Sequence, residues 1–138
     1  MHPLFVYGSL KEGFPNFHIN RGRRIAGQFR TVLPHPLHLV NGRLPCLLPL
    51  PGQGLQVAGQ LFEVDDAALA AMDALERVGR PGGYQRIVIA VQRSAGEGPA
   101  AALDAFVYVQ SPALLDGSGP HEGPLAEYTA EHARKLRW

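Results

Sequence analysis

A glutamate at an unexpected position is the first candidate for chemistry. A helix is predicted over Ala67–Val78, and the 100° spacing of its residues places Glu76 on the same face as Leu69 and Met72. A carboxylate on a core-facing side is unfavourable unless it is paired or used, and the helix dipole also disfavours it in the last turn. We therefore interpret Glu76 as a candidate general acid/base. Alternatively, it bends to solvent or pairs with a nearby arginine: Arg77, Arg80 or Arg86.

A turn near the beginning of the chain is the second candidate. The apolar run Leu4–Tyr7 predicts a buried strand, and Gly8 and Ser9 interrupt it abruptly. A glycine at this point allows a positive φ and a close approach of a ligand to the backbone. Successive N–H groups in such a turn form a nest that suits a carboxylate or a phosphate. The alternative is an ordinary turn at the end of a strand.

The helix that carries Glu76 has recognisable ends. Asp65 or Asp66 is expected to be the N-cap, and Gly79 is expected at C′, the first position beyond the helix. Asp73 falls nearer the polar edge of the helix and is expected to be solvated. The sequence thus predicts one apolar face that packs on the core and directs Glu76 inward.

Strands dominate the rest of the pattern. They are expected at Leu4–Tyr7, Ile25–Val32, Gln56–Val64, within Tyr84–Arg93, and at Ala105–Val109. Prolines exclude a helix across residues 34–51, and irregular connections are expected at Ser94–Ala102 and Ser111–Pro124. A surface helix is expected over Leu125–Leu136. This order of elements predicts an α+β fold with a curved or closed sheet.

Composition excludes several functional classes. The 138 residues fit a single domain, residues 1–138. A net charge of +1 gives no excess of positive charge with which to bind nucleic acid or an anionic membrane. The single Cys46 fits a reducing compartment, and no apolar stretch is long enough to span a bilayer, so a cytoplasmic location is expected. His35 and His38 lack a third ligand at metal-like spacing, so we interpret them as structural or surface residues and expect no metal site.

Four motifs together resemble a known family. They are Val6-Tyr7-Gly8-Ser9-Leu10-Lys11 with Gly13 and Asn16, then Leu69-x-x-Met72-Asp73-x-Leu75-Glu76, Tyr84-Gln85-Arg86, and Phe106-Val107-Tyr108. In this order and spacing they are similar to the γ-glutamylcyclotransferase-like proteins, and most similar to the γ-glutamylamine cyclotransferase and AIG2-like branch. The resemblance implies a small mixed β-barrel of about five to seven strands, flanked by helices, with the active-site cavity at the barrel mouth.

The resemblance also implies an activity that needs no cofactor. In this family the α-amine of a γ-glutamyl group attacks its own γ-carbonyl, which yields 5-oxoproline and a free amine or amino acid. Glu76 matches the family's catalytic glutamate, and the backbone amides of Tyr7, Gly8, Ser9 and Leu10 match the loop that holds the substrate carboxylate or the oxyanion. Ser9 would then act through its N–H and not as a nucleophile. Further pocket-wall residues implied are Tyr7, Asn16, Tyr84 and Tyr108.

Alternatives remain open at this point. Each tyrosine could instead be a core aromatic residue whose hydroxyl reaches a backbone carbonyl. The whole chain could be a non-catalytic module that binds carboxylate or γ-glutamyl ligands, although a core-facing Glu76 counts against this. A phosphate-handling enzyme ranks third, because the Lys-Ser/Thr pair of a P-loop is missing. The expected partner is a small γ-glutamyl compound. The sequence does not identify the amine that leaves, and it predicts no oligomeric state.

Overall fold

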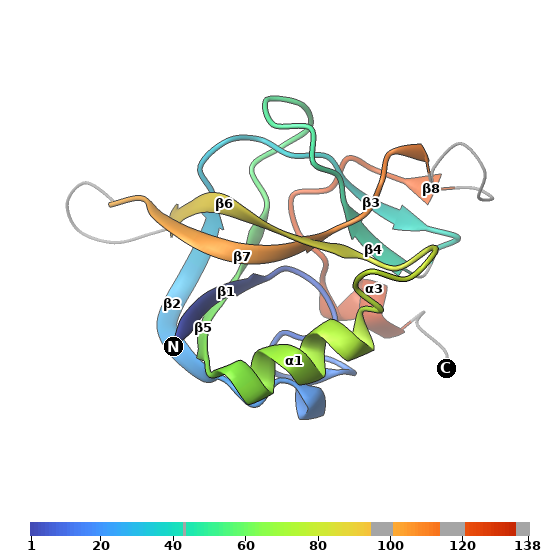
Figure 1. Ribbon diagram of the computed structural model, residues 1–138. Helices are drawn as coiled ribbons and strands as arrows, with labels where there is room; N and C mark the ends of the chain where they lie inside the picture. Colours follow the sequence, from blue (N-terminus) through green and yellow to red (C-terminus); the bar gives the residue numbers. More distant parts are fainter. Residues whose placement is uncertain (43, 95–100, 114–120, 135–138) are drawn as a thin grey trace.

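The computed structural model describes residues 1–42, 44–94, 101–113 and 121–134 (Figure 1). Strands dominate, as expected. Their bounds are β1 His2–Val6, β2 Arg23–Thr31, β3 Leu37–Val40, β4 Leu44–Leu47, β5 Ala58–Val64, β6 Gln85–Arg93, β7 Leu103–Val109 and β8 His121–Glu122. The helical segments are η1 Phe17–Ile19, α1 Asp66–Leu75 and α3 Ala130–Arg134.

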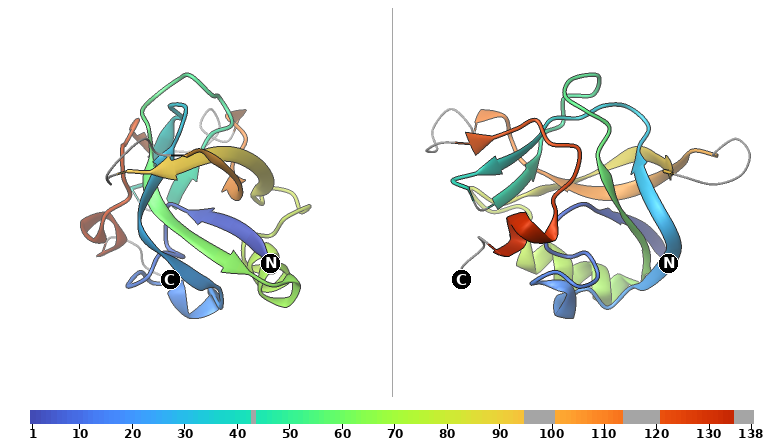
Figure 2. Two further views of the ribbon diagram at one scale, coloured as in Figure 1. Left: turned by 90° about the vertical axis from the view of Figure 1, so that its left-hand side faces the viewer. Right: turned by 180° about the vertical axis from the view of Figure 1, so that it is seen from behind.

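Five strands close into a barrel in the order β1-β5-β2-β6-β7. β1 runs antiparallel to β5 and parallel to β7, with Leu4 opposite Phe106, and this parallel pair closes the barrel. The remaining strands form a second sheet in the order β4-β3-β8, which lies beside the barrel (Figure 2). The N–H of Gln110 donates to the Leu47 carbonyl at 2.8 Å and so joins the end of β7 to β4. The predicted mixed barrel with flanking helices is confirmed.

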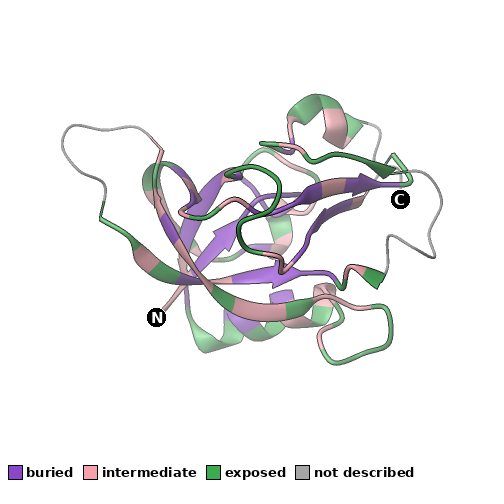
Figure 3. Ribbon diagram, turned by 90° about the horizontal axis from the view of Figure 1, so that it is seen from above, coloured by how far each residue is buried: buried purple, intermediate pink, exposed green. Residues whose placement is uncertain are grey.

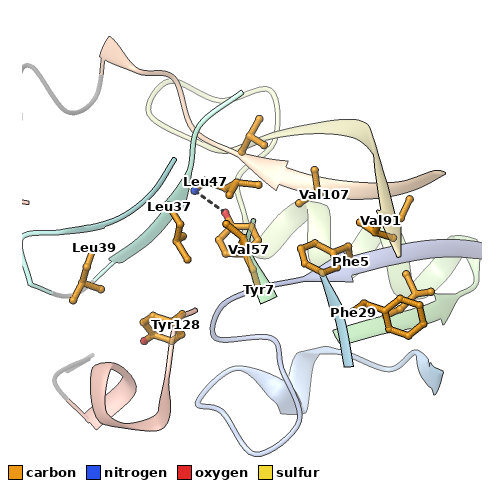
Figure 4. Close-up of a cluster of buried hydrophobic side chains, with 13 residues drawn as sticks. Phe5, Tyr7, Phe29, Leu37, Leu39, Leu47, Val57, Val91, Val107 and Tyr128 are labelled. Carbon is orange, nitrogen blue, oxygen red and sulfur yellow. Dashed lines mark hydrogen bonds between the residues drawn. The ribbon is translucent and has the colours of Figure 1, made fainter. Parts of the chain in front are cut away.

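The alternating side chains of β1 divide the core in two. Phe5 and Tyr7 point into the barrel, where they pack with residues from the other strands, among them Phe29 and Val107 (Figure 4). Leu4 and Val6 point outward and belong to a second buried cluster beneath α1. β1 is therefore buried on both faces, which explains its unbroken apolar sequence. Figure 3 shows buried residues following the strands, whereas much of α1 is exposed.

Helix α1 begins as predicted but ends earlier. Asp65 is its N-cap and accepts a hydrogen bond from the Ala68 N–H at 2.7 Å. The predicted end at Val78, with Gly79 at C′, is wrong. The N–H of Val78 donates to the Asp73 carbonyl, and the Arg77 N–H donates to the carbonyl of Ala74. These two bonds form a Schellman motif in which Arg77, at φ 58°, takes the left-handed position and Glu76 becomes the C-cap.

The middle of the chain forms a hairpin that the sequence did not specify. The described residues between 34 and 51, which leave out residue 43, contain no helix, as expected. Instead β3 and β4 pair with each other, with His38 opposite Cys46. Pro45 fits within β4 because β4 is an edge strand of its sheet. Nδ1 of His38 lies 3.1 Å from Nδ1 of His121, and this contact links β3 to β8. His38 therefore has a structural role. His35 is buried and its Nδ1 lies 2.9 Å from the Leu33 carbonyl oxygen.

The last part of the chain differs from its prediction. The helix begins at Ala130 instead of Leu125, and residues 135 and 136 lie outside the described residues. Before it, the N–H of Leu125 donates to Leu37 and the carbonyl of Ala126 accepts from Ala58, so the segment is tied to two strands. Residues 95–100 and 114–120, which cover most of the first expected irregular connection and half of the second, also lie outside the described residues. The second connection was expected to be irregular up to Pro124, but it contains the short strand β8.

Tyr128 fixes this segment to the barrel. Its side chain is completely buried in the core, and its carbonyl accepts a hydrogen bond from the ammonium group of Lys11. Burial lowers the pKa of Lys11 from 10.5 to about 8, partly offset by the nearby negative charge of Glu127. The C-terminal segment is thus held directly beside the loop that follows β1.

Candidate functional site

A cavity of about 310 Å³ opens where β1 ends. Its wall combines the loop after β1, the start of β4, the end of α1, the turn before β6, and β7. The lining residues are Phe5, Val6, Tyr7, Gly8, Ser9, Leu10, Asn16, Leu44, Pro45, Leu75, Glu76, Arg77, Gly82, Gly83, Tyr84 and Tyr108. Every residue that the sequence predicted for the site is among them. The fold therefore brings all of these residues to one cavity, although they are spread over a hundred positions of the chain.

Glu76 lies at this wall because the Schellman motif ends α1 there. Its backbone carbonyl accepts a hydrogen bond from the Tyr84 N–H at 2.9 Å, which fixes the helix end against the start of β6. Within the described residues, the Glu76 carboxylate has neither a hydrogen-bond donor nor a cationic partner. Burial alone raises its pKa from 4.5 to about 7. A carboxyl group in this state can both take up and give back a proton near neutral pH.

The arginines do not neutralise Glu76. Arg86 instead forms an ion pair with Asp73, with Nη1 2.7 Å from Oδ2. Arg77 and Arg80 are exposed, and the ion pairs found among the described residues include neither of them. The alternative in which Glu76 pairs with an arginine is therefore wrong for the part of the chain that the structure describes.

The loop after β1 forms part of the cavity wall. The carbonyls of Gly8 and Ser9 accept hydrogen bonds from the N–H groups of Lys11 and Asn16, at 3.1 and 2.9 Å. The Asn16 side chain adds a bond from Nδ2 to the Ser9 hydroxyl at 2.9 Å. The N–H groups of Gly8, Ser9 and Leu10 have no acceptor among the residues described. Three consecutive free donors at a cavity wall suit an anion or a developing oxyanion.

Gly8 is needed for a reason other than the one expected. Its φ lies outside the left-handed region, so the expected positive φ is wrong. A Cβ at this position would come within 2.9 Å of Cγ of Pro45, which packs across the loop. Close packing of β4, rather than an unusual turn, therefore excludes a larger residue here.

The three tyrosines of the cavity differ in how their hydroxyls are used. The Tyr7 hydroxyl donates to the Tyr108 carbonyl at 2.6 Å. It also accepts a hydrogen bond from the Leu47 N–H at 3.2 Å, which is the dashed line in Figure 4. The Tyr84 hydroxyl donates to the Pro45 carbonyl at 2.8 Å. Both therefore follow the structural alternative, in which a hydroxyl reaches a backbone carbonyl. The Tyr108 hydroxyl instead donates to Oδ1 of Asp73 at 2.7 Å. Burial raises the pKa of all three, so they stay protonated at neutral pH.

Asp73 is the residue that the sequence placed wrongly. Asp73 was expected to be solvated, but it is half-buried. It forms an ion pair with Arg86 and accepts a hydrogen bond from the Tyr108 hydroxyl. One signal was available, since Asp73 lies three residues before Glu76 and so faces the same side of the helix end. The contribution of Pro45 to the wall had no such signal, because it depends on the pairing of β3 with β4. Cys46 lies beside the cavity, with Sγ 3.5 Å from the Tyr84 hydroxyl, and burial raises the pKa of its thiol to about 11.

Metal ligands and membrane-spanning helices are further features that would bear on function. Within residues 1–42, 44–94, 101–113 and 121–134, no group of three or more His, Cys, Asp or Glu side chains is placed to hold a metal ion. None of the helices in that part of the chain has the length and the apolar content that crossing a membrane requires.

Known proteins share this sequence and this fold. A family model described as "Gamma-glutamyl cyclotransferase, AIG2-like" matches residues 4–131. A protein of Bos taurus named gamma-glutamylaminecyclotransferase is 34% identical over 142 residues, which covers 99% of this chain and 80% of the relative. The human protein of the same name is 37% identical over 118 residues, covering 76% of each chain.

Solved structures agree with the sequence relatives. The crystal structure of an AIG2-like protein from Mus musculus superposes with a TM-score of 0.78 at 31% identity, and covers 100% of this chain and 95% of the mouse chain. An Arabidopsis thaliana protein solved in solution superposes at 0.61 with 21% identity, a likeness of fold alone. These comparisons confirm the resemblance found in the sequence and support a cyclotransferase enzyme. The chain belongs to the gamma-glutamyl cyclotransferase, AIG2-like family.

Proposed function

We propose that this protein converts a γ-glutamyl amine or a γ-glutamyl amino acid into 5-oxoproline and the free amine, with Glu76 as general acid/base. The observation that carries the proposal is the half-buried carboxyl group of Glu76, which has no partner among the described residues and a pKa of about 7. It lines a cavity whose wall also includes three residues with free N–H groups, Gly8, Ser9 and Leu10. The names of the bovine and human relatives support the γ-glutamylamine branch of this chemistry.

The residues of the cavity suit each step of the reaction. Glu76 as carboxylate takes a proton from the substrate α-ammonium, and the resulting amine attacks the γ-carbonyl carbon to form the new C–N bond. Negative charge then develops on the carbonyl oxygen, and the N–H groups of Gly8, Ser9 and Leu10 are suited to stabilise either this oxygen or the α-carboxylate. As the old C–N bond breaks, the protonated Glu76 returns its proton to the leaving nitrogen.

Much of the rate enhancement is expected from positioning. The nucleophile and the electrophile belong to one substrate, so the protein must hold a folded conformer rather than supply a nucleophile. Good intramolecular geometry contributes up to roughly 7–11 kcal/mol in favourable cases. Ser9 fits this view, because its hydroxyl accepts a hydrogen bond from Asn16 and is hydrogen-bonded to no basic side chain among the described residues.

A non-catalytic binding module of the same fold is the second candidate. It would use the free N–H groups for a carboxylate ligand. Glu76 counts against this candidate. Its negative charge beside a carboxylate ligand would weaken binding, and removing that charge from water is itself unfavourable.

Release of 5-oxoproline tests the proposal. The wild type, Glu76→Gln and the control Glu131→Gln, which makes the same change on an exposed residue of α3, are incubated with γ-glutamyl-lysine, other γ-glutamylamines, γ-glutamyl amino acids and glutathione. We expect release by wild type and control, and a rate at least ~100-fold lower for Glu76→Gln. Equal rates in all three would remove Glu76 from the mechanism, and no release with any substrate would favour the binding module.

A further inference from the structure

The hydroxyl protons of the cavity tyrosines determine what these residues can offer a ligand. The Tyr7 hydroxyl donates one hydrogen bond to a backbone carbonyl and accepts one from a backbone N–H, so both of its bonds hold the fold together. Tyr84 gives its proton to the Pro45 carbonyl. Tyr108 gives its proton to a carboxylate, the strongest acceptor of the three. None of the three hydroxyls therefore donates into the cavity.

Asp73 fixes the direction of the Tyr108 hydroxyl. A carboxylate can only accept, so the proton of the 2.7 Å bond between Tyr108 Oη and Asp73 Oδ1 must lie on the tyrosine. Arg86 holds the second oxygen of Asp73, at 2.7 Å, and its guanidinium also stacks 4.7 Å from the ring centroid of Phe106. This chain of contacts leaves the carboxylate little freedom to rotate away.

With its proton engaged, the Tyr108 hydroxyl has only oxygen lone pairs left to offer a ligand in the cavity that Tyr108 lines together with Glu76. The two groups are close enough that the negative charge of Glu76 contributes to raising the pKa of Tyr108. One part of the wall thus carries acceptors, a carboxylate and a phenol oxygen. The loop after β1 carries donors, the free N–H groups of Gly8, Ser9 and Leu10. Such a division of acceptors and donors matches a zwitterion.

We propose that Tyr108 is the hydrogen-bond acceptor for the substrate α-ammonium group, and that Asp73, held by Arg86, is the positioning residue that makes it an acceptor. The inference deepens the proposed function and rests on it for the identity of the substrate. An ammonium group has three N–H bonds, so one can point to Tyr108 while another gives its proton to Glu76. The bond to Tyr108 then holds the nitrogen in place while it becomes a nucleophile.

The opposite assignment, Tyr108 as a donor to the oxyanion, does not fit these contacts. It would require the hydroxyl to turn away from Asp73 and leave a half-buried carboxylate with one partner fewer. The raised pKa of Tyr108 also excludes a phenolate that would attract the ammonium by charge. A neutral acceptor with a fixed direction is the role that remains.

Binding of two unreactive ligands tests the inference. S-butyl-homocysteine carries the α-carboxylate and the α-ammonium group but has no γ-carbonyl, so it cannot cyclise. Its deaminated counterpart, 4-(butylthio)butanoate, carries the carboxylate alone. Affinities for wild type, Tyr108→Phe and Asp73→Asn are measured by calorimetry at pH 7.5. Asp104→Asn, the same change on an exposed residue of β7, is the control.

Selective weakening of one ligand is the expected result. Tyr108→Phe removes the acceptor, and we expect roughly 10- to 100-fold weaker binding of S-butyl-homocysteine, with little change for the deaminated ligand. In Asp73→Asn the amide oxygen is expected to face Arg86, because the guanidinium group has only donors. The NH₂ group of the new asparagine then faces Tyr108. Since both groups are donors, the hydroxyl proton of Tyr108 turns into the cavity. This variant should show the same selective loss, although the Tyr108 hydroxyl is still present.

Other outcomes would overturn the inference. They are an equal loss for both ligands, no loss in either variant, and wild-type protein that does not prefer the ammonium-bearing ligand. Melting curves measured by circular dichroism identify any variant that fails to fold, in which case the other variant decides. The result is separable from the proposed function. A selective effect in a protein that releases no 5-oxoproline refutes the reaction alone, and normal turnover without selectivity refutes only the role of Tyr108.

Discussion

The half-buried carboxyl group of Glu76 should make the protein less stable at neutral pH than at acid pH. Its pKa is 4.5 in an unfolded chain and about 7 in the folded protein. Below pH 4.5 both states hold the proton and the penalty is absent. As the pH rises to 7 the unfolded chain ionises first, so folding loses free energy, and above pH 7 the loss is complete. At about 1.4 kcal/mol per pH unit this amounts to roughly 3 kcal/mol.

Replacing Glu76 by glutamine removes this pH-dependent penalty. We expect the free energy of unfolding of Glu76→Gln, minus that of wild type, to increase by up to about 3 kcal/mol between pH 4.5 and pH 8.5. Urea unfolding at several pH values measures the difference, in which the other titrating groups cancel. With a slope of about 1–3 kcal/mol per molar urea, the midpoint of the variant should shift upward by at least about 1 M relative to wild type.

The control for this prediction is Glu131→Gln, which should not show a comparable pH-dependent gain, because its side chain is exposed. A difference between Glu76→Gln and wild type that stays constant with pH would refute the reasoning. It would mean that Glu76 reaches solvent or finds a charge partner in solution. The predicted result would make Glu76 a residue that reduces stability at neutral pH, where the proposed reaction needs its carboxylate.

Two further predictions follow from the same geometry. Since Glu76 must be ionised to accept a proton, kcat/KM for 5-oxoproline formation should fall about tenfold for each pH unit below about 7; an acid limb near the ordinary pKa of 4.5 would contradict this. Tyr7→Phe leaves the buried Tyr108 carbonyl and the Leu47 N–H each without its hydroxyl partner, so urea unfolding should show a loss of about 2–4 kcal/mol. A loss under about 0.5 kcal/mol would mean that water replaces the hydroxyl.

Sequence reasoning succeeded where the determining interactions are local. The apolar run that became β1, the cap at Asp65 and the buried face with Leu69 and Met72 all follow from residue type and periodicity. Glu76 became a candidate because it breaks two local rules at one position, and the structure places it in the cavity wall. The motifs that resemble the family then added the barrel, which no pattern within a short window predicts.

Failures occurred where distant segments decide the structure. The helix end at Glu76 depends on Arg77 accepting a left-handed conformation, against the preference for glycine, and on the bond from Tyr84. The segment that begins at Leu125 pairs with strands instead of forming a helix turn, because Tyr128 is buried in the barrel. Asp73 was expected to be solvated because its partner Arg86 lies on another element.

The free N–H groups of the loop after β1 affect how the site can change in evolution. A peptide N–H is the same group whichever residue carries it, so mutation of a side chain at Ser9 or Leu10 leaves the donor in place. Natural selection can therefore act there on the shape of the loop and tolerate many residues, with proline, which has no N–H, as the clear exception. Comparison of side chains alone would underestimate this part of the site. The role that we propose for Glu76, in contrast, resides in its side chain and would be lost by a single mutation.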